Sequence, residues 1–175
     1  MSVFDEPKID CHAHVFDPVR FPYRPDTFYR PAGQELATAS QLQAVMDAYG
    51  VRHVLLVGPN SGYATDNRCL IDAIARGGGR FKGIAVVDPD ASTDELVRLK
   101  AAGIVGVAFN ATLLGVDYCL EASDLLARLT DLDMLLQIQA EKDQLVGLLP
   151  LLERSRVRLL IDHCGRPDPE AGLEQ

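Results

Sequence analysis

Short apolar runs rich in Val, Ile and Leu alternate along this chain with segments whose apolar residues recur every three to four positions. Each run ends near a Gly, Pro, Asn or Asp, as strands of a buried sheet commonly do. The runs predict strands at residues 9–15, 52–58, 82–88, 104–109, 134–139 and 157–162. The amphipathic segments predict helices at residues 40–49, 66–76, 92–102, 119–131 and 142–154.

Several of these segments carry end signals. Ser92-Thr93-Asp94-Glu95 is a capping box, which predicts a helix start there. Gly50 and Gly103 follow predicted helices at the position where a left-handed glycine ends a helix, and a strand comes directly after each. Short turns between strands and helices predict right-handed crossovers and a parallel sheet with helices on its faces.

Two α/β architectures fit this alternation: a doubly wound open sheet, and a (β/α)8 barrel of the TIM type with about six of its eight units present. A glycine-rich phosphate loop between a strand and a helix would favour a nucleotide-binding open sheet, but the chain lacks one. Its glycine run, Gly77-Gly78-Gly79, follows a helix and predicts a helix exit. The length of 175 residues predicts one domain over residues 1–175.

One long irregular segment, residues 16–39, follows the first predicted strand. It is rich in proline and in aromatic residues. Such a loop is either a lid over a site or a plug beneath the core. Its position after the first strand favours an active-site loop.

Composition excludes some functions. A formal net charge of -8 opposes sequence-independent binding of nucleic acid or of an anionic membrane. No apolar run approaches the roughly 18 residues of a membrane span, and residues 1–8 lack the pattern of a secretory signal. We therefore expect a cytoplasmic protein. Its four cysteines are widely spaced, which predicts free, buried thiols, with Cys11 facing covering helices.

The candidate chemistry lies in three histidines. His12 and His14 end the first apolar run, and period-two alternation predicts that they point the same way. His163 follows the last predicted strand. Such imidazoles can form a metal site or bind an anionic substrate. The alternative is that they are polar strand ends that meet water or a backbone carbonyl.

Several segments together resemble the amidohydrolase superfamily, within its amidohydrolase 2 branch, which includes pyrone-dicarboxylate lactonase, sulfomuconolactone hydrolase and galactarolactone isomerase. The resemblance covers residues 9–168. The matching segments are Ile9-Asp10-Cys11-His12-Ala13-His14-Val15-Phe16, Phe21-Pro22-Tyr23, Thr65-Asp66-Asn67, Gly106-Val107-Ala108-Phe109-Asn110 and Asp162-His163-Cys164-Gly165-Arg166-Pro167-Asp168. The resemblance implies a (β/α)8 barrel that opens lactones, hydrolyses related carboxylates or decarboxylates aromatic acids.

The chain also departs from the family pattern. The resemblance implies a general base, an aspartate after the eighth strand, and the predicted strands reach only the sixth. Metal-binding relatives tend to carry a histidine at the end of the fifth strand, where this chain has Gln137 and Gln139. Lactonases for pyrone dicarboxylate have an arginine where Ala108 stands and a second one nearby that Thr112-Leu113-Leu114 does not supply. We therefore expect at most one weakly held metal ion and a substrate other than pyrone dicarboxylate.

In the implied barrel, His12, His14 and His163 converge on the mouth as catalytic residues and as the ligands of any metal. One divalent ion, Zn²⁺ or Mn²⁺, would activate water and polarise a carbonyl, and a metal-free mechanism through protonated histidines is the alternative. Asp10 either orients the histidines or satisfies backbone donors. Asp162 has the opposite strand parity from His163, which predicts a structural role.

Four residues are candidate substrate contacts: Arg166, Asn110, Tyr29 and Ser61. The guanidinium of Arg166 suits a substrate carboxylate, and a surface pair with Asp168 is its alternative.

The sequence thus favours a hydrolase that opens a small carboxylated lactone. A metal-dependent decarboxylase or a lactone isomerase on the same scaffold is the alternative, and so is a non-catalytic, self-associating fragment. Six strands of an eight-stranded barrel leave two open edges, which favours a homo-oligomer or another partner that covers them.

Overall fold

The computed structural model describes residues 6–171, so the expectation of no leader in residues 1–8 lies partly outside the described residues. Six parallel strands follow one another. They are β1 (Lys8–Ala13), β2 (Val51–Val57), β3 (Phe81–Val86), β4 (Ile104–Asn110), β5 (Leu135–Gln139) and β6 (Arg158–Ile161). All six predicted strands are confirmed, each with its ends within two residues of the prediction.

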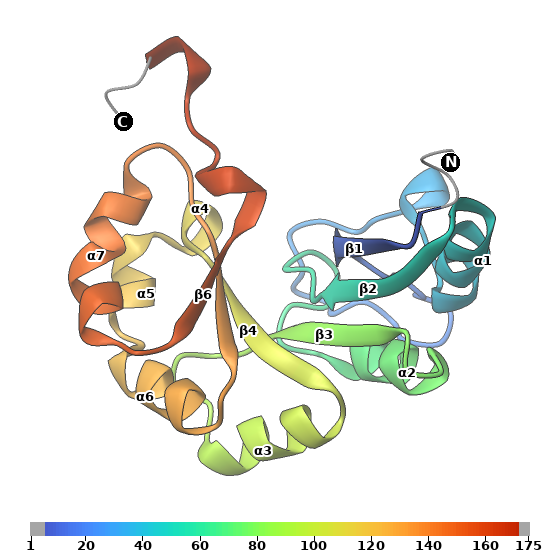
Figure 1. Ribbon diagram of the computed structural model, residues 1–175, viewed down its shortest axis with the longest axis horizontal. Helices are drawn as coiled ribbons and strands as arrows, with labels where there is room; N and C mark the ends of the chain where they lie inside the picture. The colour runs from blue at the N-terminus through green and yellow to red at the C-terminus, as the bar shows by residue number, and fades with distance from the viewer. Residues whose placement is uncertain (1–5, 172–175) are drawn as a thin grey trace. The chain divides into compact units, whose positions relative to one another are not determined.

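Helices separate the strands (Figure 1). They are α1 (Ala39–Tyr49), α2 (Arg68–Arg76), α3 (Thr93–Ala101), α4 (Ala111–Leu114), α5 (Val116–Leu120), α6 (Ser123–Asp131) and α7 (Gln144–Arg154). Short 3-10 turns cover Gly33–Glu35, Asp162–Gly165 and Pro169–Ala171.

The helix predicted at 119–131 is wrong in one respect, because the chain breaks it into α5 and α6. The amide of Ala122 donates to the carbonyl of Cys119, which closes a turn between the two helices. Leucines continue on both sides of this turn, so the apolar spacing did not reveal it. The helix signals at the other ends are confirmed: Ser92 Oγ accepts from the amide of Glu95, and Gly50 ends α1 in the left-handed conformation.

The strand order of the sheet is the chain order, β1-β2-β3-β4-β5-β6. Parallel strands in sequential order, joined by helices, are the arrangement of a (β/α)8 barrel, and the chain supplies six of its eight strands. A doubly wound sheet reverses its strand order at a switch point, which this order does not do. The end strands β1 and β6 expose apolar side chains, among them Ile9 and Leu159.

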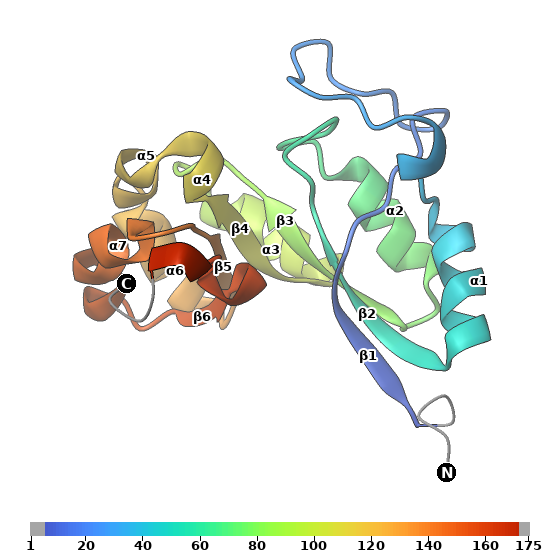
Figure 2. The same ribbon diagram turned by 90° about the horizontal axis from the view of Figure 1, so that it is seen from above.

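The chain divides into two compact units. The first comprises residues 1–86 and 101–105. In it, β1 pairs with β2 and β2 with β3, while α1 packs on β2 and α2 on β3. Both helices lie on the same side of these strands (Figure 2). A Cβ at Gly83 would lie 2.6 Å from Cδ1 of Ile104 and 2.7 Å from Cδ1 of Ile74, so a larger residue there would require these side-chain ends to shift.

The second unit comprises residues 87–100 and 106–175. In it, β4 pairs with β5 in the register Asn110↔Gln139, and β5 pairs with β6. Helix α6 packs on β5 and buries three leucines at helical spacing: Leu125, Leu126 and Leu129. Helix α7 buries Leu148 and Leu152. The helices thereby cover one face of these strands with a leucine-rich layer.

All four cysteines are free thiols, as predicted, but only Cys69 and Cys119 are buried. The expectation that Cys11 faces covering helices is wrong, because Cys11 is exposed on the edge strand β1. Cys164 is exposed in the turn after β6.

Among residues 6–171, the longest helices have 11 residues, too few to cross a membrane.

Candidate active site

His12 and His14 lie at the carboxyl end of β1 and face each other. Their Nε2 atoms are 3.3 Å apart, and the rings meet edge to face. His14 Nδ1 lies 2.7 Å from the carbonyl oxygen of Val57, at the end of the neighbouring strand β2. A carbonyl oxygen can only accept, so Nδ1 carries the proton, and in the neutral ring Nε2 holds a lone pair directed at His12.

The backbone of β1 helps to bring the two imidazoles together. The pairing of β1 with β2 is irregular between Asp10 and Ala13, and Asp10 Oδ1 accepts from the amide of His12 at 3.0 Å. Of the two roles considered for Asp10, the structure shows the second, because its carboxylate accepts from a backbone amide. The carboxylate is exposed, and it fixes the start of the His12-Ala13-His14 segment.

The imidazole pair offers two nitrogens that could bind one metal ion. Their Nε2 atoms are 3.3 Å apart, and imidazole nitrogens are common ligands of divalent ions such as Zn²⁺. Histidine ligands commonly donate their second ring N–H to a carbonyl or carboxylate, as His14 does to Val57. The residues present therefore fit a divalent ion on His12 and His14.

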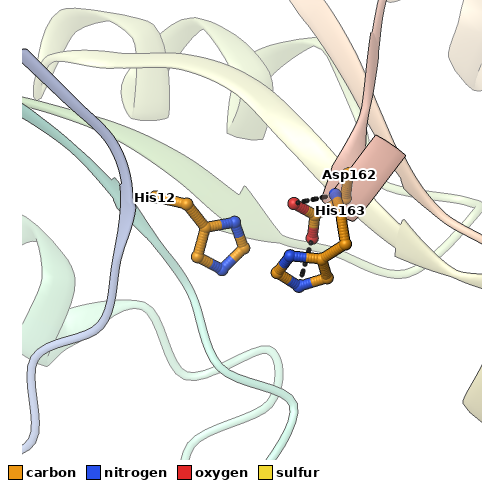
Figure 3. Close-up of side chains that lie close together, drawn as sticks. All are labelled: His12, Asp162 and His163. Atoms are coloured by element: carbon orange, nitrogen blue, oxygen red, sulfur yellow. Dashed lines mark hydrogen bonds and ion pairs between the residues drawn. The ribbon is translucent and has the colours of Figure 1, made fainter. Parts of the chain in front are cut away.

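His163 lies in the second unit, in the 3-10 turn directly after β6, and pairs with Asp162. Asp162 is buried, and one of its oxygens accepts from the amide of His163 at 3.1 Å. Its other oxygen lies 3.3 Å from His163 Nε2 (Figure 3). A carboxylate that contacts both the backbone amide and the ring nitrogen orients the ring of His163.

Strand parity placed the side chains of Asp162 and His163 on opposite faces, but the chain leaves the strand at Asp162 and the two side chains meet. His163 and Cys164 have positive φ angles of 48° and 55°, so the backbone turns and both Asp162 and His163 take part in one contact. A non-glycine residue in this conformation is strained, and such strain clusters at functional sites. The signal available in the sequence was the Asp-His dipeptide itself, immediately followed by Cys-Gly.

Arg166 follows in the same turn and is exposed. Its Nη1 lies 3.8 Å from Glu141 Oε2, and its backbone carbonyl accepts from the amide of Lys142. The ion pair between Arg166 and Glu141 is long and exposed to solvent, so it is weak. The guanidinium can therefore bind another carboxylate in place of Glu141 with little loss of free energy.

Asn110 is the last residue of β4, and both the oxygen and the nitrogen of its side-chain amide form hydrogen bonds. Its Oδ1 accepts from the amide of Leu113, which caps α4, and its Nδ2 donates to Gln139 Oε1 at 3.0 Å. Gln139 ends the next strand, β5. The sequence indicated Asn110 as a substrate contact, but it did not indicate that Asn110 pairs with Gln139, which lies 29 residues away in the chain.

Tyr29 and Ser61 belong to the first unit. The hydroxyl of Tyr29 donates to Glu35, and this contact lowers the pKa of Glu35 and raises that of Tyr29. The backbone carbonyl of Tyr29 accepts from the amide of Gly62, next to Ser61. Ser61 is half-buried, in the connection between β2 and α2. The structure thus brings the backbones of these two candidates close together.

The segment 16–39 is tied to the connection between β2 and α2 (Figure 2). Arg24 donates its amide to the carbonyl of Gly62, and the amide of Gly62 donates to Thr27 Oγ1 as well as to Tyr29. Gly62 has φ +74°, and a Cβ there would lie 2.7 Å from the ring of Tyr23. Only glycine permits both the backbone conformation and the close approach.

An aromatic cluster supports this tether. The rings of Phe16 and Tyr23 pack on Tyr63, with centroids 6.0 Å and 5.1 Å away. The hydroxyl of Tyr63 accepts from the amide of Asp17, and burial raises the pKa of Tyr63. The assignment of this segment as an active-site loop stays a prediction; the structure shows that hydrogen bonds and ring contacts anchor it to the connection between β2 and α2.

Comparison with known proteins gives a consistent result. The amidohydrolase family profile matches residues 9–175. A 2-pyrone-4,6-dicarboxylate hydrolase from Comamonas testosteroni is 32% identical over 169 residues, which are 95% of this chain and 54% of that protein. A 4-sulfomuconolactone hydrolase from Rhizobium radiobacter is 31% identical over 171 residues, 95% of this chain and 56% of that protein.

Among solved structures, a probable 2-pyrone-4,6-dicarboxylic acid hydrolase from Acinetobacter baumannii, with citric acid bound, superposes with a TM-score of 0.85 at 35% identity. The match covers 95% of this chain and 62% of that one. The chain thus spans a little over half the length of the curated relatives it matches.

Proposed function

Because the chain belongs to the amidohydrolase family, we propose that it forms part of an enzyme that opens a small carboxylated lactone by polarising the ring carbonyl for attack by water. The observation that carries this proposal is the fixed imidazole pair of His12 and His14 at the carboxyl end of β1. Active sites of (β/α)8 barrels lie at this end of the strands. The two relatives named for hydrolysis of a pyrone and of a lactone support the reaction class.

In this proposal, His12, His14 and His163 act on the carbonyl oxygen of the substrate. The contact with Val57 keeps the proton of neutral His14 on Nδ1 and leaves the lone pair of Nε2 beside His12. Asp162 orients the ring of His163 through the contact between its carboxylate and Nε2. The general base is the aspartate that the family resemblance places after an eighth strand, which the six strands of this chain do not include.

The same three imidazoles would hold one divalent ion, Zn²⁺ or Mn²⁺. When bound, such an ion lowers the pKa of its water to about 7 and polarises a carbonyl. Gln139 stands where metal-binding relatives carry another histidine, so fewer protein ligands would be available and an ion would be held weakly. In the metal-free alternative, protonated imidazoles donate directly to the carbonyl oxygen.

Arg166 is the proposed partner of the substrate carboxylate, because its present ion pair with Glu141 is long and exposed. Tyr29 and Ser61, both in the first unit, are the other proposed substrate contacts. Ala108 offers no charge where lactonases for pyrone dicarboxylate carry an arginine, which favours a substrate with a single carboxylate.

The test uses the protein expressed from its full reading frame, with muconolactone and 2-pyrone-4,6-dicarboxylate as substrates and ring opening followed by base uptake. We expect muconolactone to be the better substrate. His14→Ala lowers kcat/KM by about 10²-fold or more, whereas His53→Ala, an exposed histidine at the start of β2, serves as the matched control and has little effect. Activity that is equal in the two variants, or no ring opening with or without Zn²⁺ and Mn²⁺, contradicts the proposal.

Product analysis and sedimentation separate the alternatives. Release of CO2 identifies a decarboxylase, and conversion to an isomeric lactone without base uptake identifies an isomerase. A chain that self-associates through its open strand edges and opens no lactone corresponds to the non-catalytic reading. Elemental analysis that finds two tightly bound metal ions per chain rules out the single-ion site.

A further inference from the structure

We propose that the side-chain amide of Gln139 donates a hydrogen bond to the substrate, and that Asn110 sets the orientation of this amide. This inference rests on the proposed function, because it assigns a further substrate contact within the same site. It gives Asn110 a positioning role in place of the direct contact expected from the sequence.

The orientation follows from one backbone group. The amide of Leu113 can only donate, so the atom of Asn110 that lies 2.9 Å from it is the oxygen, Oδ1. The other end of the Asn110 side chain is therefore the NH2 group, which can only donate. Its neighbour at 3.0 Å must accept, so that neighbour is Oε1 of Gln139. The NH2 group of Gln139 is thereby turned away from Asn110.

The position of Gln139 places this group on the proposed substrate side. Asn110 and Gln139 are register partners at the carboxyl ends of β4 and β5. Their neighbours Phe109 and Ile138 are buried, and Phe109 packs against Tyr118 of α5. Because side chains alternate along a strand, Asn110 and Gln139 lie on the face opposite these helices. In a (β/α)8 barrel that face is the interior, and the carboxyl end is its mouth.

The NH2 group of Gln139 is available for a ligand. Gln139 is half-buried, and among residues 6–171 its Nε2 has no hydrogen-bond partner. A partly buried donor of fixed orientation favours a ligand oxygen that only accepts, such as a carboxylate or a lactone carbonyl oxygen. It also discriminates against analogues that lack this oxygen, since the donor then stays unpaired.

Two conservative substitutions reverse the hydrogen-bonding polarity of this position. Gln139→Glu keeps an oxygen for Asn110 Nδ2 and turns the second oxygen toward the ligand. Asn110→Asp keeps the oxygen that caps α4 but removes the donor to Gln139. The Gln139 amide then flips to donate to Asp and presents its own oxygen to the ligand, although residue 139 is unchanged.

The experiment uses ¹⁵N-labelled protein from the full reading frame and citrate as an unreactive, acceptor-rich carboxylate. In the wild type, we expect citrate to shift the side-chain NH2 signals of Gln139. Both variants should bind citrate about ten-fold more weakly or worse, as for loss of a hydrogen bond to a charged group. Asn110→Asp should keep the thermal midpoint of the wild type, because the cap of α4 is retained. Gln43→Glu, on α1, is the control for the added charge.

Kinetics with muconolactone provide the second measurement. We expect both variants to raise KM about ten-fold while kcat changes little, since the amide binds the carboxylate in substrate and transition state alike. The proposal is overturned if the Gln139 signals do not respond to citrate, or if both variants bind like Gln43→Glu. If both variants open the lactone with normal kinetics, only this inference is refuted. If the wild type opens no lactone, the proposed function is refuted, and the citrate titration alone then tests the role of Gln139.

Discussion

Asn67 joins the start of α2 to the end of β3, and its removal is the sharpest test of how the first unit is held together. Its side chain is buried, with 8% of its surface exposed. Nδ2 donates to the carbonyl of Val86 at 2.8 Å and to that of Thr65 at 3.1 Å, and Oδ1 accepts from the amide of Val86 at 3.1 Å. The same amide group packs over Gly58, which follows Val57, the residue that holds His14.

The magnitude follows from these three contacts. A hydrogen bond contributes a net of about 1 kcal/mol to folding, which gives about 3 kcal/mol for the three. Asn67→Ala also leaves the buried N–H and C=O of Val86 without their side-chain partner, at about 1–3 kcal/mol for each group that water does not reach. The three lost hydrogen bonds set the minimum, so we expect Asn67→Ala to lower the free energy of unfolding by about 3 kcal/mol or more, a large part of the 5–15 kcal/mol typical of a domain.

Urea unfolding, followed by circular dichroism and extrapolated linearly, measures this loss. Asn60→Ala is the matched control, because Asn60 lies in the same connection and its side chain makes no hydrogen bond among residues 6–171. We expect the control to change stability by less than about 0.5 kcal/mol. A loss below about 1 kcal/mol for Asn67→Ala, or equal losses in the two variants, refutes the reasoning.

Two further predictions concern charge and thiols. Arg20 binds Asp72 through two hydrogen bonds and lowers the pKa of Asp72, so their contribution to stability is present at neutral pH and is lost as pH falls through the lowered pKa. The difference in unfolding free energy between wild type and Arg20→Met should therefore shrink toward zero in acid, and a difference that is constant with pH contradicts this. Burial raises the pKa of the Cys119 thiol to about 11 and also raises that of Cys69, so Ellman's reagent should label two thiols per native chain and four after denaturation. Labelling of all four at one rate in the native protein contradicts the assigned burial.

Period-two alternation predicted correctly that His12 and His14 would point the same way, although the pairing of β1 is irregular here and His14 lies just beyond the strand. It did not anticipate the contact between Asp162 and His163, because the chain leaves the strand there and His163 and Cys164 adopt positive φ angles. The parity argument also missed that Cys11 is exposed, since the position of β1 at the end of the sheet follows from the strand order.

The sequence also could not identify hydrogen-bond partners that are separated by loops or lie on neighbouring strands. Asn110 and Tyr29 were selected as polar groups at suitable places, but their partners Gln139 and Glu35 follow from register and loop conformation. The roles of these two residues toward substrate stay predictions. The sequence thus located the strand ends that carry polar chemistry, while the direction in which each amide or hydroxyl points required the structure.

The tether between segment 16–39 and Gly62 bears on the thermodynamics of ligand binding. Fixing the backbone of one residue costs about 1–2 kcal/mol of conformational entropy, so ordering even a few loop residues on binding would remove most of the affinity for a small molecule. Hydrogen bonds from Arg24 and to Tyr29 and Thr27 hold this segment in place. Much of its conformational entropy is therefore lost during folding, and a ligand that contacted the segment would not have to order it.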